Sequence, residues 1–341
     1  MKPLPNLRAQ ARCRRRCFVA VLALALGAAT APFGSALAAQ KEQGDKIVVS
    51  GASGKLARDA IVALLERGVK LVDLVLVTRT PEKLTSFSSN GAAVRLGDFD
   101  RPETLDAAFA GGRQLLLIST NSSGDRVAEH TNAIFAARKA GIRHIVYTSF
   151  VNATTDNPSL IAREHQLTEQ ALMKSGVPYT ILRNQLYMDR LVAEAAQAIK
   201  TGDLYTNSAH GKWAPVARQD CATAAAIVLT TPGHEGKVYD ITGPELISYQ
   251  DFAKTIDEVT GKRVRVVDVD DATFVARAVQ AGVPEATAKL NASFGLATRM
   301  NSLNMRSEAL QILLGQKPEG VRDMLIENKS LLVTSPQLRA Y

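Results

Sequence analysis

The chain has 341 residues and a formal net charge of +8, with 46% hydrophobic and 5% aromatic residues. This length allows one full-size α/β domain and a smaller lobe. The charge is concentrated at one end: the first 39 residues hold six basic and no acidic residues, which leaves 35 basic and 33 acidic residues elsewhere. A nearly neutral body with few aromatic residues argues against nucleic acid as a partner.

The first 39 residues have the pattern of an export signal. Arginines precede an apolar run at 18–26, and Ala36-Leu37-Ala38 offers the small residues that signal peptidase requires. Arg15-Arg16-Cys17-Phe18 resembles a twin-arginine motif, which favours export of a folded protein to the periplasm; an ordinary Sec signal is the alternative. The apolar run is short, so we expect no membrane span after cleavage.

Cysteine and histidine usage gives no sign of a disulfide or a metal site. Cys13 and Cys17 would leave with the signal, so Cys221 alone remains and no internal disulfide can form. The five histidines are scattered and form no Cys/His group with metal-ligand spacing. We therefore expect no bound metal.

From residue 46 onward, short apolar runs alternate with longer segments of helical period. We expect strands at 46–50, 71–78, 92–96, 114–119, 143–149 and 178–183, with helices at 55–68, 81–88, 102–110, 125–140 and 159–175. The strands are continuous apolar runs, as sheets covered on both faces require. This rhythm predicts an α/β fold with a Rossmann-type, doubly wound parallel sheet.

The βαβ rhythm weakens after residue 184. We expect helices near 186–200, 219–230, 248–260, 270–283 and 303–315, strands near 237–242 and 263–268, and a turn at 200–203. The predicted organisation is an export signal (1–39), a Rossmann domain (40–184) and a smaller C-terminal α+β lobe (185–341). We expect this lobe to cover the substrate and to be interleaved with the Rossmann core.

A glycine-rich turn follows the first strand, with the sequence Gly51-Ala52-Ser53-Gly54-Lys55-Leu56-Ala57. A strand, a tight turn and a helix N-terminus together form an anion site, because backbone N–H groups and the helix dipole point at a phosphate. For Lys55 a solvated loop position is the alternative. We predict that the turn binds the pyrophosphate of a dinucleotide through Gly51, Ala52, Ser53, Gly54, Lys55 and Leu56.

Arg79 follows the second predicted strand. NAD-selective folds place a carboxylate here for the ribose 2′-hydroxyl, whereas an arginine favours a 2′-phosphate through bidentate hydrogen bonds. The alternative is a surface arginine at a strand end. We therefore predict NADP(H) as the cofactor.

Small polar residues occupy the ends of the next strands. Asp98 and Phe99 follow the third strand and could flank the adenine, although Asp98 could equally cap the helix expected at 102–110. Ser119 and Thr120 end the fourth strand, and Thr148 and Ser149 end the fifth. Because ligands bind at the carboxyl ends of such strands, we expect these residues at the nicotinamide and its ribose; turn formation is their alternative role.

The Tyr-x-x-x-Lys motif of short-chain dehydrogenases is missing. Tyr147, Tyr179 and Tyr187 are followed four residues later by Val151, Arg183 and Leu191. Carbonyl reduction needs a proton donor of lowered pKa, but hydride transfer to a quinone needs far less because the product phenolate is stable. His165 could act as a donor or contact the acceptor ring; a histidine on a helix surface is the alternative.

Several motifs together resemble the NmrA-like group of atypical short-chain dehydrogenases, and within it the NAD(P)H:quinone oxidoreductases. They are the glycine turn, Arg79-Thr80-Pro81-Glu82-Lys83, Leu115-Leu116-Leu117-Ile118-Ser119, Tyr147-Thr148-Ser149, Glu164-His165, Tyr179-Thr180-Ile181-Leu182-Arg183-Asn184, Tyr187, and Gly233-His234-Glu235-Gly236-Lys237-Val238-Tyr239. The resemblance runs from about residue 46 to residue 317. It implies NADPH binding and hydride transfer to quinones or related conjugated acceptors.

The resemblance also implies roles for single residues. Asn184 would lie at the nicotinamide; His165 and Tyr187 would be catalytic; and Phe150, Asn152 and Tyr187 would contact the acceptor. Two positions depart from the family pattern: Gln185-Leu186 stands in place of a Gly-Trp pair, and Asn152 stands where a histidine is common.

The expected protein is an NADPH-dependent quinone-type reductase that is a monomer or a homodimer. One alternative is a non-enzymatic NAD(P)-binding sensor, as some NmrA-like relatives suggest. An isoflavone-type reductase is a third possibility, whereas the missing Tyr-x-x-x-Lys motif argues against a sugar-nucleotide epimerase.

Overall fold

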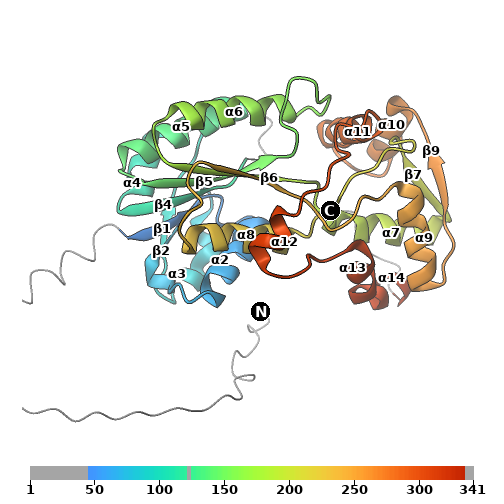
Figure 1. Ribbon diagram of the computed structural model, residues 1–341, viewed down its shortest axis with the longest axis horizontal. Helices are drawn as coiled ribbons and strands as arrows, with labels where there is room; N and C mark the ends of the chain where they lie inside the picture. The colour runs from blue at the N-terminus through green and yellow to red at the C-terminus, as the bar shows by residue number, and fades with distance from the viewer. Residues whose placement is uncertain (1–44, 121–123, 335–341) are drawn as a thin grey trace, which may run out of the picture. The chain divides into compact units, whose positions relative to one another are not determined.

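The computed structural model describes residues 45–120 and 124–334. Within them, a seven-stranded sheet has the order β3-β2-β1-β4-β5-β6-β8 (Figure 1), and every neighbouring pair is parallel. The strands are β1 (Lys46–Val49), β2 (Leu74–Thr78), β3 (Ala93–Leu96), β4 (Gly112–Leu117), β5 (His144–Phe150), β6 (Tyr179–Asn184) and β8 (Lys237–Ile241). The order reverses between β1 and β4, the point where open α/β sheets bind ligands. The predicted Rossmann-type fold is confirmed.

Helices cover both faces of the sheet, as Figure 1 shows. One face carries α2 (Lys55–Glu66), α3 (Thr85–Ser88), α8 (Arg218–Thr230) and α12 (Ala309–Leu314), and the other carries α4 (Leu105–Phe109), α5 (Arg126–Lys139) and α6 (Ala162–Lys174). Every residue of β2 and of β5 is buried, as expected for strands packed on both sides. The sheet is therefore the middle layer of three.

A second group of elements has its own core around Trp213, Leu204 and Phe252. It consists of the two-stranded sheet β7 (Asp203–Thr206) and β9 (Arg265–Asp268) with α7 (Asp189–Thr201), α9 (Tyr249–Thr260), α10 (Asp271–Gln280), α11 (Glu285–Arg299), α13 (Val321–Glu327) and α14 (Lys329–Thr334). The chain after residue 184 thus supplies this group and also α8, β8 and α12 of the main sheet. The boundary placed there stays a prediction.

Some expected elements differ from those observed. The strand expected at 71–78 begins at Leu74, because Leu71–Asp73 forms a 3-10 turn closed by a hydrogen bond from Asp73 N–H to the Lys70 carbonyl (2.9 Å). The helices expected at 81–88 and 102–110 each begin as a 3-10 turn, Pro81–Leu84 and Pro102–Thr104, before α3 and α4. Proline suits the first turn of a helix, and short first turns are often 3-10.

The second group was less predictable. The elements β7, α11, α13 and α14 were not predicted, and the helix expected at 303–315 shortens to α12. Gly202 ends α7 with a positive φ of 82°, as the expected turn requires, but β7 begins directly after it and pairs with β9 about sixty residues away. A short strand whose pairing partner lies far along the chain has little in its own local sequence to identify it as a strand.

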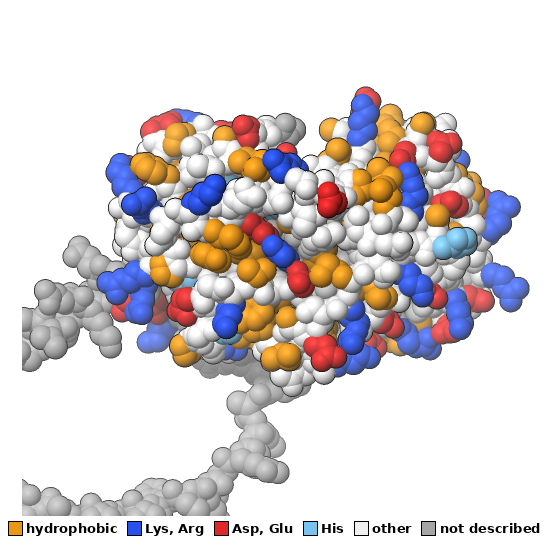
Figure 2. All heavy atoms as spheres, turned by 45° about the horizontal axis from the view of Figure 1, so that its top comes forward, with side chains coloured by type: hydrophobic (Ala, Val, Ile, Leu, Met, Phe, Trp, Pro, Cys, Tyr) orange, Lys and Arg blue, Asp and Glu red, His pale blue; other side chains and the backbone are white. Residues whose placement is uncertain are grey.

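Two surface features complete the description. None of the helices in the described ranges is both long and apolar enough to cross a membrane. Figure 2 shows that basic and acidic side chains are interspersed on the face in view.

Candidate active site

The glycine turn leaves β1 at the point where the strand order reverses. Gly51 has a positive φ of 59°, a conformation that glycine adopts at little cost. The N–H of Ala52 donates to the carbonyl of Val77 (2.9 Å), and the N–H of Gly54 donates to the carbonyl of Gly51 (2.8 Å). A Cβ on Gly54 would lie only 3.1 Å from that Gly51 oxygen. The turn is therefore tight and anchored to β2.

No side chain of the turn or of α2 caps the N-terminus of this helix. Gly54 is the N-cap in an extended conformation, no side chain caps the helix, and its first turn holds no acidic residue. The first N–H groups of a helix lack intrahelical acceptors and carry the positive end of the dipole. The turn and helix start thus fit the pyrophosphate of a dinucleotide, as expected for Gly51 to Leu56.

Ser53 connects this turn to the end of β2. Its Oγ accepts a hydrogen bond from Oγ1 of Thr78 (2.9 Å). Arg58 of α2 donates from Nε to the carbonyl of Ser53 (3.2 Å) and from Nη2 to the carbonyl of Lys83 (3.0 Å). The turn and the segment that carries Arg79 are therefore held in one fixed arrangement.

Arg79 directly follows β2, and its side chain is exposed. Among the described residues it forms no hydrogen bond or ion pair. Its recorded interaction is electrostatic, with the exposed carboxyl group of Asp100: Glu129 above all raises the pKa of that carboxyl group, and Arg79 opposes the rise. An exposed, uncommitted guanidinium beside the turn is the donor that a 2′-phosphate requires. The geometry fits the predicted NADP(H) preference.

Asp98 and Phe99 lie after β3. The alternative of a helix cap at Asp98 is wrong, because Arg101 and Thr104 occupy the N-cap positions and neither helix start has a side-chain cap. Instead, the Asp98 carboxylate accepts from the N–H of Asp100 (3.3 Å). Phe99 is only 8% exposed and packs edge-on against His130, with ring centroids 6.5 Å apart. A role for either residue at the adenine stays a prediction.

A hydrogen bond links the carboxyl ends of β4 and β5, where residues expected at the nicotinamide lie. Oγ1 of Thr148 accepts from the N–H of Ser119 (3.0 Å). Oγ1 of Thr120 is buried and has no partner within the described ranges. Ser149 instead donates its hydroxyl to Oε1 of Glu169 (2.6 Å), so that hydroxyl is already engaged in the core.

Glu169 of α6 is the centre of a buried ion cluster, which we define as Ser149, Glu169 and Arg183. Arg183 forms a bidentate pair with it, from Nε to Oε1 (2.9 Å) and from Nη2 to Oε2 (2.6 Å). The side chain of Glu169 is 4% exposed and that of Arg183 is 27% exposed. Its hydrogen bonds with Glu169 raise the pKa of the Arg183 guanidinium, and the cluster joins β5, β6 and α6.

His165 lies in a second buried group, the histidine cluster, which we define as His130, Tyr147, His165 and Thr168. Nδ1 of His165 and the hydroxyl of Tyr147 are 2.7 Å apart, and Nδ1 of His130 lies 3.0 Å from Oγ1 of Thr168. Burial lowers the pKa of His130 to about 3 and that of His165 well below its usual value, and it raises that of Tyr147. All three titratable groups are therefore neutral near pH 7.

The histidine cluster corrects the alternative for His165, which is 4% exposed and is not a helix-surface residue. Its ring centroid lies 6.2 Å from that of Phe150, and Phe150 lies 5.8 Å from Phe294 of α11. The structure thus brings together two predicted residues, one assigned to catalysis and one to the acceptor.

Tyr187 and Asn184 form a separate pair. Nδ2 of Asn184 donates to the hydroxyl of Tyr187 (3.1 Å), whereas Oδ1 of Asn184 is buried without a partner in the described residues. Tyr187 packs against the core on the α2 and α8 face, while His165 lies on the α5 and α6 face. Burial raises the pKa of Tyr187, so its hydroxyl keeps its proton. The two residues predicted to be catalytic therefore belong to different packing environments.

Asn152 and Gln185, the two departures from the family pattern, both contact the second group of elements. Asn152 has a positive φ of 48° and donates from Nδ2 to the carbonyl of Ser302 (2.9 Å). Gln185 donates from Nε2 to the carbonyl of Leu303 (3.2 Å). These amides hold the segment after α11 against the ends of β5 and β6.

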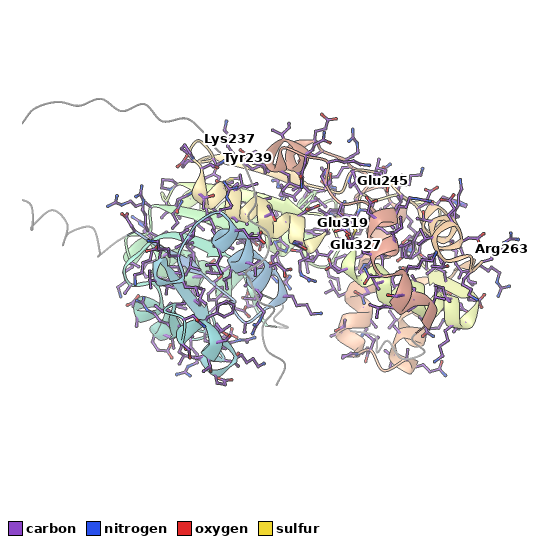
Figure 3. The ribbon with its side chains drawn as sticks, turned by 90° about the horizontal axis from the view of Figure 1, so that it is seen from below. Lys237, Tyr239, Glu245, Arg263, Glu319 and Glu327 are labelled. Carbon is purple, nitrogen blue, oxygen red and sulfur yellow. The ribbon has the colours of Figure 1, made fainter. Side chains whose placement is uncertain are left out.

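A cavity of about 380 Å³ lies among α2, α7, α8, α13 and α14. Arg218 pairs there with Asp59 (2.7 Å) and Asp189 (2.8 Å), while Glu319 and Glu327 lie close together, as Figure 3 shows. Burial and then Glu327 raise the pKa of Glu319 to about 7. None of the residues predicted to bind cofactor or acceptor lines this cavity.

Sequence reasoning missed His130, Thr168, Glu169 and Arg126 of the α5 and α6 face. Arg126 is 7% exposed, pairs with Glu164, and donates from Nε to the carbonyl of Thr120 (3.0 Å). The available signal was the helical spacing of His130 with the small apolar Ala133 and Ala137, which places a histidine on a buried helix face.

Comparison with known proteins agrees with this geometry. A family model described as NAD(P)H-binding matches residues 51–232. Quinone oxidoreductase 2 of Escherichia coli (strain K12) is 34% identical over 269 residues, which cover 79% of this chain and 93% of that protein. An NAD(P)H azoreductase of Xenophilus azovorans is 29% identical over 252 residues, which cover 74% of this chain and 87% of the relative.

A solved structure also matches closely. The triphenylmethane reductase of Citrobacter sp., crystallised with NADP(H), superposes with a TM-score of 0.79 at 33% identity, covering 83% of this chain and all of that one. Because it covers 83% of the chain, this similarity necessarily extends beyond residue 232, where the match to the family model ends.

Proposed function

Because the chain belongs to the NAD(P)H-binding, NmrA-like family, we propose that it is an NADPH-dependent oxidoreductase that reduces quinones or similar conjugated acceptors. The observation that carries the acceptor class is the match to a quinone oxidoreductase over nearly all of that relative's length. A match of 269 residues within a chain of 341 necessarily includes the segment around Phe150 and Asn152.

One set of residues would bind the phosphates of the cofactor, and a second set would orient its nicotinamide ring and ribose. The turn from Gly51 to Leu56 would hold the pyrophosphate and Arg79 the 2′-phosphate, while Ser119, Thr148 and Asn184 would orient the nicotinamide and ribose. The bound NADPH supplies the hydride. None of the described residues predicted at the site is a convincing nucleophile, so catalysis would come from holding donor and acceptor rings in contact and shielding them from water.

Stopped-flow oxidation of NADPH with a panel of benzoquinones tests this function. We expect NADPH oxidation well above the buffer rate with at least one quinone, and slower oxidation with NADH. Tight NADP⁺ binding without any oxidation above buffer would instead favour the non-enzymatic sensor.

We further propose that the protein is exported to the periplasm through a cleaved twin-arginine signal. Residues 1–39 lie outside the described residues, so the support is the arginine-rich start, the short apolar run and the small residues at 36–38. Export of a folded domain would allow it to leave the cytoplasm with its cofactor bound.

Replacing both Arg15 and Arg16 by lysine tests the route. We expect the uncleaved precursor to accumulate in the cytoplasm, detected by its larger mass on an immunoblot. Normal export of the double variant would point to the Sec route.

A further inference from the structure

The hydrogen bonds of the histidine cluster have a direction that begins at the backbone. The N–H of Thr120 lies 3.1 Å from Nε2 of His130, and a backbone N–H can only donate. Nε2 of His130 is therefore an acceptor. The low pKa of this buried ring keeps it neutral, so its one proton is on Nδ1.

The hydroxyl oxygen of Thr168 accepts the hydrogen bond that Nδ1–H of His130 donates. Its Oγ1 donates its own hydrogen to the carbonyl of Glu164 (2.9 Å), which leaves a lone pair to accept from Nδ1 of His130 (3.0 Å). The same Nδ1 lies 3.4 Å from the hydroxyl oxygen of Tyr147. Because Nδ1 of His130 carries hydrogen, it cannot accept from that hydroxyl.

Tyr147 must then donate to His165. Its hydroxyl is fully buried and also interacts with the side chain of Thr168, but its shortest contact is with Nδ1 of His165, at 2.7 Å. With the reverse polarity the buried phenol hydrogen would lose this acceptor, which is unfavourable for a buried donor. A neutral His165 that accepts at Nδ1 carries its proton on Nε2.

The surroundings of His165 oppose a second proton. The charged and titratable groups that act on it are His130 and Arg126 from α5, with Tyr147 of β5 in contact. Two carboxyl groups of α6, Glu164 and Glu169, act on Tyr147 in turn. Burial, His130 and Arg126 all lower the pKa of the imidazole. Within the described residues Nε2 has no hydrogen-bond partner, and the ring faces Phe150, a predicted acceptor contact.

We propose that Thr120, His130, Thr168 and Tyr147 fix His165 as the neutral Nε2–H tautomer, and that this N–H donates to the acceptor oxygen as it becomes negative. The proposal rests on the proposed function. A quinone that gains a hydride, with its two electrons, becomes a hydroquinone monoanion, and a proton from water completes the hydroquinone. His165 keeps its proton throughout, and Tyr147 is a positioning residue. A neutral imidazole can stabilise such an oxyanion without having to be recharged in each turnover.

The tautomer of His165 can be measured without any substrate. In ¹⁵N-labelled protein with NADP⁺ bound, the imidazole nitrogens would be assigned by their loss in His165→Gln. We expect a neutral ring with the proton on Nε2, unchanged between about pH 5.5 and 8.5. A proton on Nδ1, or a doubly protonated ring within that range, would overturn the proposal.

Tyr147→Phe tests whether the Tyr147 hydroxyl determines which nitrogen of His165 carries the proton. Removing the phenol should mix the two tautomers of His165 and shift both nitrogen resonances. Tyr179→Phe is the matched control, because Tyr179 packs in the same core and its hydroxyl makes no hydrogen bond with a described residue. Unchanged resonances in Tyr147→Phe, or equal shifts in both variants, would contradict the positioning role. The wild-type measurement stands even if Tyr147→Phe does not fold.

Activity separates this proposal from the proposed function. We expect His165→Leu to lower kcat for benzoquinone about a hundredfold at unchanged KM, the loss typical of one oxyanion donor. His165→Gln, which retains a neutral N–H donor, should recover a part of that loss. Equal activity of the wild type and His165→Leu would remove the role in catalysis, whereas inactivity of the wild type towards every quinone would count against the function and leave the tautomer result intact.

Discussion

The two faces of the sheet bury very different side chains. Against α2 and α8 the core is almost entirely apolar, built from residues such as Ile61, Leu64 and Val228. Against α5 and α6 the molecule buries a histidine cluster, an ion cluster and the guanidinium of Arg126. Burying polar and charged groups is favourable only when their hydrogen bonds are satisfied. We therefore expect the apolar face to contribute packing beneath the glycine turn, and the polar face to lie beside the acceptor chemistry.

This contrast yields predictions that run from the largest expected effect to the smallest. Glu169→Ala should cost about 3–5 kcal/mol of unfolding free energy, because it leaves the partly buried Arg183 without its bidentate partner. Urea unfolding followed by circular dichroism measures the loss. Glu285→Ala, which removes one partner of an exposed pair with Lys289, should leave the midpoint unchanged. If both variants behave alike, the buried ion cluster is not structural.

Leu64→Ala probes the apolar face. Leu64 is fully buried in α2, so the cavity should cost roughly 2–4 kcal/mol. We expect the affinity for NADPH, measured well below the melting temperature, to stay within about twofold of the wild type, since this face contributes packing. A loss of affinity as large as that of a site variant would contradict the division between the faces.

Arg79→Ala removes the predicted contact with the 2′-phosphate. A lost charge-assisted hydrogen bond should weaken NADPH binding by about 1.5–3 kcal/mol and leave NADH binding unchanged. Isothermal titration with both nucleotides measures this. Arg113→Ala is the matched control, because it also removes one positive charge. Arg113 lies at the N-terminal end of β4, at the edge of the sheet opposite the predicted cofactor site. An equal loss for both nucleotides would make Arg79 a structural residue.

Glu319→Gln gives the smallest and most pH-dependent effect. A carboxyl group whose pKa is raised to about 7 on folding favours the folded state when protonated, so its contribution is lost as pH rises from about 4.5 to 7. Above pH 7 the variant should be more stable than the wild type by about 1 kcal/mol, a value reduced by solvent screening of this partly exposed group. At pH 4, where Glu319 is protonated in the folded protein, the melting curves of the wild type and of Glu319→Gln should coincide. A variant less stable than the wild type at pH 8 would contradict the assignment.

The sequence predicted the dinucleotide half well because its signals are local. The glycine turn, the apolar strands and Arg79 lie within a few residues of the elements that position them. The histidine cluster could not be predicted in the same way, since Thr120, His130, Tyr147 and His165 come from four segments that meet only in the folded sheet. The same reason explains β7, whose stabilising partner β9 lies far along the chain.

The preference for a phosphorylated dinucleotide is the claim on which the account depends most. Titration of the mature wild-type chain with NADPH and with NADH measures it directly. We predict that NADPH binds about ten- to a hundredfold more tightly, the ratio equivalent to the contact assigned to Arg79. Equal dissociation constants for the two nucleotides, or no binding of either, would contradict it.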